Sequence, residues 1–313
     1  MVITTSALTR RFGTVVAVDH LDLDLPTGGV IGLVGPNGSG KSTLIRMLLG
    51  LISPSDGSAE VLGGSIDDPR AYAHRVGALI ESPAFVPGLS ARANLVSLAR
   101  LRGLPLSRVD QVLETVGLLG RDREPVKCFS LGMKQRLGIA AALLPDPDLL
   151  LLDEPTNGLD PAGIVEIRGL LQDLGRSGRT VVVSSHLMTE IESICSHVVV
   201  IRFGVLMYAG PMADLLVRAV SHVDVSAEHQ EDEPRLAQAL AAAGWDVSTR
   251  PAGGTRVFAS LDAAARVNRD AQAAGFTLAS LIGGRDSLET IFLEMTGDND
   301  ADLAVARTGA VAR

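Results

Sequence analysis

The arrangement of apolar and polar positions divides the chain into a larger first part and a smaller second part. Near the N-terminus, "MVITTSAL" and "VVAVDHLDLDLP" read as paired strands, and the alternation in "LDLDL" predicts a half-exposed antiparallel strand. Farther along lie three continuous apolar runs, "DLLLLDEP", "TVVVSSH" and "SHVVVIRFG", with helices expected between them. Runs of this kind are typical of strands buried on both faces, so they predict a parallel sheet that helices cover on each side.

Helical patterns fill the space between these strands. Residues 85–145 are expected to be mostly helical, because "ARANLVSLARLRG" and "SRVDQVLETVGLLG" both show helical periodicity. A separate helix is predicted from Lys41 to Leu49, closed by Gly50, after the buried strand "GGVIGLVG". The first part, residues 1–220, is therefore predicted to be an α/β domain with an antiparallel β subdomain and a helical subdomain.

The pattern changes after residue 220. Two helices with the polarity of capped helices, "EDEPRLAQALAAAG" and "DAAARVNRDAQAAG", alternate with short strands and a hairpin through "PAGG". Together with the last helix, "SLETIFLEMTG", they predict a small α+β module over residues 221–297 in the order βαββαβα. Residues 298–313 show no persistent period and are expected to be a disordered tail.

Composition narrows the classes of function. The net charge of −8 argues against a nucleic-acid partner, which needs a clustered basic face. No apolar run approaches the roughly 20 residues that span a bilayer, and the N-terminus lacks the apolar run of a signal peptide. We therefore expect a cytosolic protein, or one held at a membrane through something else. Cys128 and Cys195 are expected to be small buried residues rather than a disulfide.

A phosphate-binding loop is the strongest chemical signal. "GPNGSGKST" fits the pattern G-x-x-x-x-G-K-[ST] and stands between a predicted strand and a predicted helix. Its glycines allow backbone N–H groups to converge on phosphate, Lys41 can bridge the β- and γ-phosphates, and the Ser42 hydroxyl suits Mg²⁺. The residues predicted to bind the nucleotide here are Gly35, Pro36, Asn37, Gly38, Ser39, Gly40, Lys41, Ser42 and Thr43.

Ionisable side chains follow two of the buried strands. Asp153 and Glu154 end "LLLLDEP", where packing alone would not select carboxylates. Asp153 suits Mg²⁺, whereas Glu154 can polarise an attacking water. His186 ends "VVVSSH"; a strand-end histidine is often structural, but parallel strands bring their carboxyl ends to one edge of the sheet, which favours a catalytic role.

In this order the motifs resemble those of the nucleotide-binding subunits of ATP-binding cassette (ABC) transporters, over residues 1 to about 220. "GPNGSGKST" resembles the family's Walker A loop of a P-loop NTPase, "FSLGMKQ" its signature motif, "LLLLDEP" its Walker B strand and "NGLD" its D-loop, which contains Asp160. "SSH" resembles the switch region with its histidine, His186. Phe12 lies where the family often has an aromatic residue that stacks on adenine, although a plain hydrophobic contact is the alternative.

The resemblance explains why a second loop, "CFSLGMKQRLG", also looks fit to bind phosphate. In the family, two ATPase subunits meet head to tail, so Ser130 and Gly132 of one subunit would contact the γ-phosphate held by the other. The resemblance thus implies ATP and Mg²⁺ as ligands and a second ATPase subunit as a partner. It also implies a separate membrane permease, which would hold the protein at the inner face of the cell membrane.

One position departs from the usual family pattern. Glu81, in "VGALIESPAF", stands where most members have a glutamine that contacts Mg²⁺ and the attacking water. Glutamate there resembles the ATPases of antibiotic export and of lantibiotic or bacitracin resistance, and the C-terminal module resembles theirs too. We therefore expect an exporter ATPase in which Glu81 takes part in metal binding and catalysis, unless it is only a solvated loop acid.

Three other functions remain possible at this point. A non-transport ABC ATPase acting on ribosomes usually carries two cassettes, and one acting in DNA repair carries long heptad inserts, but the sequence has neither. A regulatory cassette without hydrolysis is disfavoured because Lys41, Asp153, Glu154 and His186 are all intact. An importer ATPase is disfavoured only by Glu81 and by the C-terminal module.

Overall fold

Two sheets organise the first part of the protein. The computed structural model describes residues 1–80, 84–217, 219–250 and 253–296. The first sheet is antiparallel, with strand order β2-β1-β4-β5. Its strands are β1 (Ile3–Phe12), β2 (Val15–Leu25), β4 (Asp56–Val61) and β5 (Gly64–Ser65). In β2, Leu21, Leu23 and Leu25 are buried whereas Asp22 and Asp24 are exposed, as the alternation predicted.

The second sheet carries the buried apolar runs. Its order is β10-β9-β3-β8-β7-β6, and all of its pairs are parallel except β9 with β10. This arrangement confirms the predicted parallel sheet. Its strands are β3 (Gly29–Val34), β6 (Val76–Leu79), β7 (Leu149–Asp153), β8 (Thr180–Ser185), β9 (His197–Arg202) and β10 (Val205–Pro211).

Both faces of the parallel sheet are covered. Helix α1 (Lys41–Leu48) contributes Leu44, Ile45, Met47 and Leu48 to the core between the two sheets, each 2% exposed or less. Burial of each such side chain stabilises the fold by about 1.5–3 kcal/mol. On the opposite face, Gly32 of β3 leaves room for Ile191 of α6 (Met188–Ile194), because a Cβ at Gly32 would lie 2.2 Å from Ile191 Cγ2.

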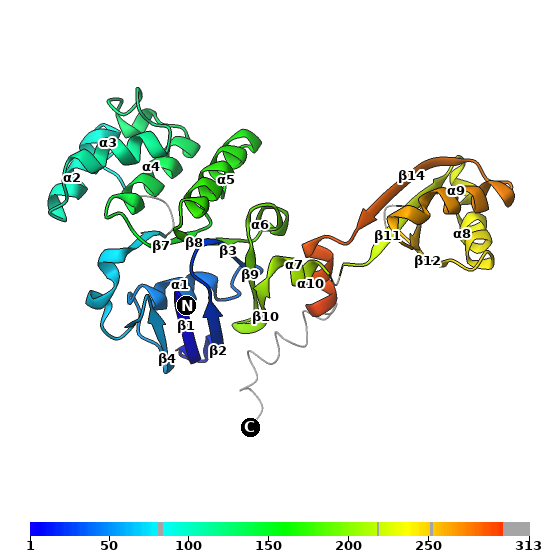
Figure 1. The fold of residues 1–313 in the computed structure, drawn as a ribbon, viewed down its shortest axis with the longest axis horizontal. Coiled ribbons are helices and arrows are strands. Elements are labelled where there is room, and N and C mark those ends of the chain that lie inside the picture. The colour runs from blue at the N-terminus through cyan, green and yellow to red at the C-terminus, as the bar shows by residue number, and fades with distance from the viewer. Residues whose placement is uncertain (81–83, 218, 251–252, 297–313) are drawn as a thin grey trace. The chain divides into compact units, whose positions relative to one another are not determined.

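The helical subdomain is as the periodicity predicted. Helices α2 (Ala91–Leu101), α3 (Ser107–Thr115) and α4 (Leu131–Leu143) lie against one another (Figure 1). Helices α5 (Pro161–Arg176) and α7 (Met212–Leu216) complete the α-helices before residue 217, together with short 3₁₀ turns. These turns are η1 (Pro69–Ala71), η2 (Ala73–Arg75) and η3 (Val126–Cys128).

One expectation about the cysteines is wrong. Cys128 is exposed, because it lies in the surface turn η3 rather than in a packed helix. Cys195 is buried as expected, and this burial raises the pKa of its thiol. Among the described residues, no helix combines the length and the apolar character needed to cross a bilayer.

The chain divides into two compact units, Met1–Ala213 and Asp214–Met295. The second unit follows the predicted order βαββαβα, and its antiparallel sheet has the order β12-β13-β11-β14. This is the split βαβ arrangement, with α8 and α9 over one face. The elements are β11 (Ser221–Ala227), η4 (Gln230–Asp232), α8 (Glu233–Ala242), β12 (Asp246–Thr249), β13 (Thr255–Phe258), η5 (Leu261–Ala263), α9 (Ala264–Ala273), β14 (Leu278–Arg285) and α10 (Leu288–Thr296).

Alternating residues of the second unit build its own core. Val223 and Val225 of β11 and Val257 of β13 are fully buried against Leu236 and Leu240 of α8. This core contains no side chain of the predicted phosphate loop, the strand-end acids or the signature motif. Glu81, which is predicted to take part in metal binding and catalysis, lies outside the described residues. Residues 298–313, which are predicted to be a disordered tail, also lie outside them.

Candidate nucleotide-binding and hydrolysis site

The predicted phosphate loop joins β3 to α1 and is shaped by its glycines. A Cβ at Gly35 would lie 2.1 Å from the carbonyl oxygen of Ile201, and one at Gly40 would lie 2.3 Å from that of Ala17. Gly40 also has a φ of +108°, which side chains rarely allow. Only glycine therefore lets the loop turn this tightly, and the turn aims the N-terminus of α1, with its unpaired N–H groups, at the space in front of the loop.

Lys41 begins α1 and is held inside the loop. Its side chain is 5% exposed, and Nζ donates to the carbonyl oxygens of Gly35 at 2.7 Å and Pro36 at 3.2 Å. Glu154 Oε1 lies 3.7 Å from the same nitrogen. Burial lowers the pKa of Lys41, and the negative charges of Glu154 and Asp153 act in the opposite direction. The ammonium is thus already placed over the loop, where an incoming phosphate would replace carbonyl contacts.

A cavity of about 280 Å³ opens in front of the loop. Seven of the predicted residues, Asn37 to Thr43, line it, and so does Glu154. Val15 and Ala17 of β2 also line the cavity. The sequence reasoning missed both, because an apolar position on an early strand carries no signal that it faces a loop more than twenty residues away.

The ends of β7 and β8 bring the predicted acids and the histidine together. Asp153 is 6% exposed, and its Oδ1 accepts a hydrogen bond of 2.5 Å from Ser184 Oγ. Glu154 follows it with a φ of +50°, and its Oε2 lies 2.8 Å from Nδ1 of His186. Lys41, Glu154 and His186 are therefore in one chain of contacts, which can hold a carboxylate beside a phosphate and a water.

A second link joins the segments that follow these strands. Thr156 Oγ1 donates a hydrogen bond of 2.8 Å to Oε2 of Glu190, and both side chains are buried. Glu190 lies on α6, four residues after His186. Sequence reasoning missed this pair, although a glutamate on the buried side of a short helix is a signal for a polar partner.

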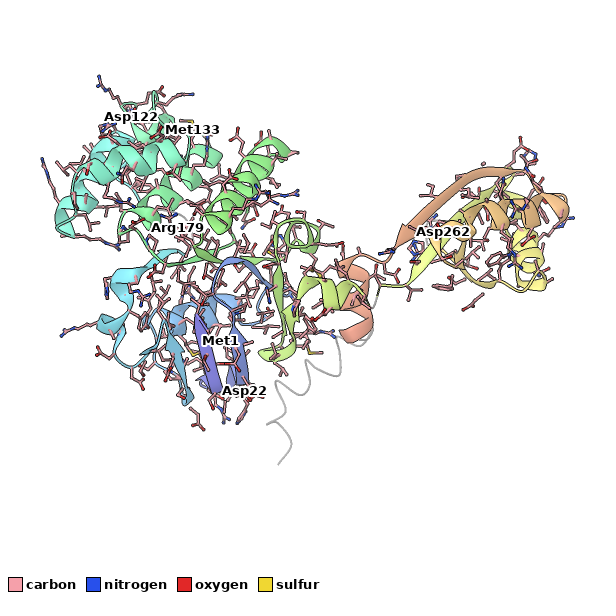
Figure 2. The ribbon with its side chains drawn as sticks, in the orientation of Figure 1. Met1, Asp22, Asp122, Met133, Arg179 and Asp262 are labelled. Atoms are coloured by element: carbon pink, nitrogen blue, oxygen red, sulfur yellow. The ribbon has the colours of Figure 1, made fainter. Side chains whose placement is uncertain are left out.

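The signature motif lies at a different cavity. Ser130 is the N-cap of α4, where its Oγ accepts from the N–H of Met133 at 3.2 Å (Figure 2 marks Met133 at this end of the helix). Asp160 caps α5 in the same way, through the N–H of Gly163 at 3.1 Å. Ser130, Gly132 and Asp160 line a cavity of about 430 Å³ that shares no lining residue with the cavity of Lys41.

The ring of Phe12 contacts Arg10, whereas most of the other residues predicted to bind the nucleotide line one of the two cavities. It lies at the end of β1, is 46% exposed and is not among the residues that line the cavity of Lys41. The guanidinium of Arg10 lies 4.5 Å from the centre of its ring. A stacking role of Phe12 toward adenine therefore stays a prediction.

The chain is similar to known proteins over most of its length. The family model "ABC transporter" matches residues 18–157. The chain is 38% identical over 302 residues to the bacitracin transport ATP-binding protein BcrA of Bacillus licheniformis, with 95% of this chain and 97% of that protein covered. Its identity to the protein of the same name from Enterococcus faecalis is 35%, over 95% of this chain and 96% of that one.

Likenesses that cover a smaller share of this chain agree. The lantibiotic transport ATP-binding protein SrtF of Streptococcus pyogenes is 40% identical over 61% of this chain and 82% of its own length. A solved ATP-binding subunit of an ABC transporter matches with a TM-score of 0.62 at 26% identity, covering 70% of this chain and 93% of its own. The chain therefore belongs to the ATP-binding proteins of ABC transporters, as the motifs predicted, and it is an ATP-hydrolysing transporter subunit built on the P-loop NTPase fold.

Proposed function

We propose that this ATPase drives the export of bacitracin or a similar amphipathic peptide antibiotic through a separate membrane permease. The observation that carries the proposal is the extent of the likeness to the two bacitracin transport proteins, which covers 95% of this chain and so includes the second unit. An importer ATPase or an ATPase acting on ribosomes or DNA has no comparable support among these relatives. At the permease the protein would lie on the inner face of the cell membrane.

The contacts at the strand ends support a role for each residue in hydrolysis. Lys41 Nζ, 2.7 Å from a loop carbonyl, can turn to the β- and γ-phosphates, beside the N–H groups of the loop and α1. Glu154 would accept the proton of the attacking water, since its Oε1 and Oε2 reach Lys41 and His186. His186 would orient that carboxylate and contact the γ-phosphate from the end of β8.

The donor set beside the loop fits Mg²⁺. Ser42 offers a hydroxyl from the first turn of α1, and Asp153 offers a carboxylate from the end of β7. Mg²⁺ is usually held by one or two carboxylates together with the phosphates of the substrate, so this hydroxyl and this carboxylate suit it. When bound, the metal would neutralise charge that develops on the β- and γ-phosphate oxygens. Glu81 is proposed as a third contributor from its sequence position.

Two separate cavities favour a head-to-tail dimer. Among the described residues, Lys41 but not the signature motif lines the loop cavity, and no lysine lines the cavity of Ser130 and Gly132. Each cavity thus has one half of the groups that bind a nucleoside triphosphate. A second copy, related by a twofold axis, would supply the other half to both sites at once. Asp160, which lines the same cavity as Ser130, would lie in that interface.

Antibiotic susceptibility tests this function directly. The chain is expressed with the membrane protein encoded beside its gene in a bacitracin-sensitive bacterium, and the inhibitory concentration of bacitracin is measured. We expect resistance to rise several-fold with the wild type and to return to the level of the empty host with Lys41→Ala, because binding of the phosphates is lost. Unchanged susceptibility, with the permease present in the membrane and the ATPase active, would exclude bacitracin as the substrate.

A further inference from the structure

A fully buried serine stands between the two acids of the site. Ser184 is the fifth residue of β8 and is 0% exposed. In the parallel sheet it pairs with Asp153 on β7 on one side and with Leu33 on β3, the strand that leads into the phosphate loop, on the other. Residues at the same register of neighbouring strands point to the same face, so the side chains of Ser184 and Asp153 point the same way.

The direction of both hydrogen bonds of this serine is determined by their chemistry. The backbone N–H of Glu154 can only donate, and it lies 2.9 Å from Ser184 Oγ. The hydroxyl accepts that bond, so its single proton is free for Asp153 Oδ1 at 2.5 Å. This distance is typical of a hydroxyl that donates to an ionised carboxylate. One hydroxyl group thus contacts both acidic residues of the site.

The hydrogen bond between Ser184 and the N–H of Glu154 is made at a residue with an unusual backbone conformation. Glu154 has a φ of +50°, a left-handed conformation that is strained for a residue with a side chain. Such a conformation persists only where the surroundings hold it in place. The hydrogen bond from its N–H to Ser184 ties the residue to β8, and the N–H of Asn157 closes the following turn on its carbonyl oxygen at 3.1 Å. This turn sets the direction in which the side chain of Glu154 leaves the backbone, and so it helps to place the carboxylate.

We propose that Ser184 is a positioning residue for ATP hydrolysis, because its hydroxyl fixes Asp153 for the metal and the Glu154 backbone for the attacking water. The proposal rests on the roles given above to Asp153 and Glu154. Ser184 would not touch the nucleotide itself, since it is fully buried and is not among the residues that line the cavity of Lys41. Its loss should therefore change the rate of the chemical step more than the binding of ATP.

Steady-state hydrolysis by the purified full-length chain tests this role. Ser184→Ala removes the hydroxyl, and Ser184→Cys keeps the shape with a slightly larger atom but offers only a weak donor. For both we expect kcat to fall about tenfold, as the loss of one buried hydrogen bond would produce, with KM for ATP within about twofold of wild type. Ser184→Thr restores the hydroxyl on a β-branched residue suited to a strand, and it should bring kcat back to within about threefold.

Thr180→Val is the matched control. Thr180 lies on the same strand, is also 0% exposed, and its Oγ1 likewise accepts from a backbone N–H, that of Gly28 at 2.7 Å. It stands at the opposite end of β8, away from the acids. The variant should lower the unfolding temperature, because a buried N–H loses its partner, while kcat and KM per folded molecule stay at wild-type values.

The variant Glu154→Gln distinguishes a failure of the general-base assignment from a failure of the role of Ser184. Turnover that persists in Glu154→Gln would overturn the base assignment and the role of Ser184 with it. If Glu154→Gln is inactive while Ser184→Ala keeps kcat within about twofold of wild type, only the role of Ser184 is excluded. An equal loss in all three Ser184 variants would also exclude it, because the hydroxyl would then not be the cause. A loss in Ser184→Ala and Ser184→Cys with recovery in Ser184→Thr supports it.

Discussion

The Nδ1 atom of His186 lies 2.8 Å from Oε2 of Glu154, although 31 residues separate the two in the chain. Each residue directly follows the end of a parallel strand, β8 or β7, so the sheet itself brings them together. Lys41 Nζ lies 3.7 Å from the other carboxylate oxygen of Glu154. The carboxylate is therefore held from two sides, which is the arrangement that a fixed general base requires.

Replacement of the base should stop hydrolysis without stopping binding. We expect Glu154→Gln to lower kcat by at least about a hundredfold while ATP affinity stays within a few-fold of wild type, because the amide keeps the shape but cannot accept a proton. Trapped ATP should hold the dimer closed, which light scattering would detect. Glu60→Gln, at an exposed position of β4, is the control and should hydrolyse ATP normally. Near-normal turnover in Glu154→Gln would contradict the assignment.

Bulk and charge at the signature motif should block dimer closure. Ser130→Arg is expected to bind ATP but to lose ATP-dependent dimerisation and most of its ATPase activity. Ser90→Arg is the matched control, because Ser90 caps α2 as Ser130 caps α4, through the N–H of Ala93 at 3.1 Å. The control should show only the cost of a lost cap, about 1 kcal/mol. Equal activity of Ser130→Arg and wild type would remove the proposed role of the motif.

Mixing two inactive variants tests whether the motif acts on the nucleotide of the other subunit. A dimer of one Ser130→Arg and one Lys41→Ala subunit has one site with both lesions and one intact site, if the sites are shared head to tail. Hydrolysis should then recover in the mixture to about a quarter of the wild-type level, since statistical mixing makes about half of the dimers mixed and each mixed dimer has one intact site of two. If each motif served its own nucleotide, no intact site would form and the mixture would stay inactive.

Removal of the chain from Ser221 onward, which holds the sheet of the second unit, should separate hydrolysis from transport. A chain that ends before Ser221 keeps every residue that lines the loop cavity, so its affinity for ATP should stay within about threefold of the full chain. We propose that the module serves dimer stability or docking to the permease, since its core contains no residue of the nucleotide site, so resistance to the antibiotic should fall. Val225→Asp, which places a charge in the core of the module, should have the same effect without shortening the chain. Normal transport by both variants would exclude this role.

A salt bridge in the helical subdomain should make stability depend on pH. Asp122, marked in Figure 2, is 5% exposed and accepts from Arg92 Nε at 2.6 Å, and this hydrogen bond lowers the pKa of its carboxyl group. A lowered pKa means that the carboxylate stabilises the fold above the unfolded value of about 3.9, and that this contribution is lost as pH falls through the folded value.

Asp122→Asn should therefore lower the free energy of unfolding by about 1–3 kcal/mol near neutral pH, and this deficit should narrow below about pH 4. Unfolding followed by far-ultraviolet circular dichroism at several pH values measures it. Asp110→Asn is the control, because that carboxylate pairs with the same arginine at 2.7 Å but is 62% exposed, so its contribution is smaller. A deficit that is the same at every pH would contradict the electrostatic explanation.

Glu81 should alter the requirement for Mg²⁺. At about 4 Å, attraction to the metal and repulsion by the phosphates are each about 4 kcal/mol per pair of unit charges at an effective dielectric constant of 20, so the two nearly cancel and geometry decides. Glutamine could donate to a phosphate oxygen, whereas ionised glutamate cannot. We expect the wild type to reach half-maximal ATPase activity at lower Mg²⁺ than Glu81→Gln. Superimposable titrations would leave Glu81 without a part in the chemistry.

The order of apolar, glycine and charged residues along the chain is enough to predict the elements and most of the chemistry. Continuous apolar runs identified the parallel strands because only strands buried on both faces need them, and the glycines around Lys41 identified the phosphate loop because backbone N–H groups must approach phosphate closely. The sequence also pointed to Asp153, Glu154 and His186, because polar side chains at the ends of buried strands have no packing role. The motif order was enough to predict the family.

The contacts between these elements could not be predicted from the sequence and come from the tertiary structure. Strand order depends on pairing between distant segments, and it is this order that places β8 between β3 and β7 and so sets Ser184 beside Asp153. A serine in an apolar strand looks like any small residue until its neighbours across the sheet are known. The same holds for Val15 and Ala17 at the loop cavity, for the pair of Thr156 with Glu190, and for the exposure of Cys128. Periodicity reports which face of an element is buried, whereas contacts between elements arise from the packing of the whole chain.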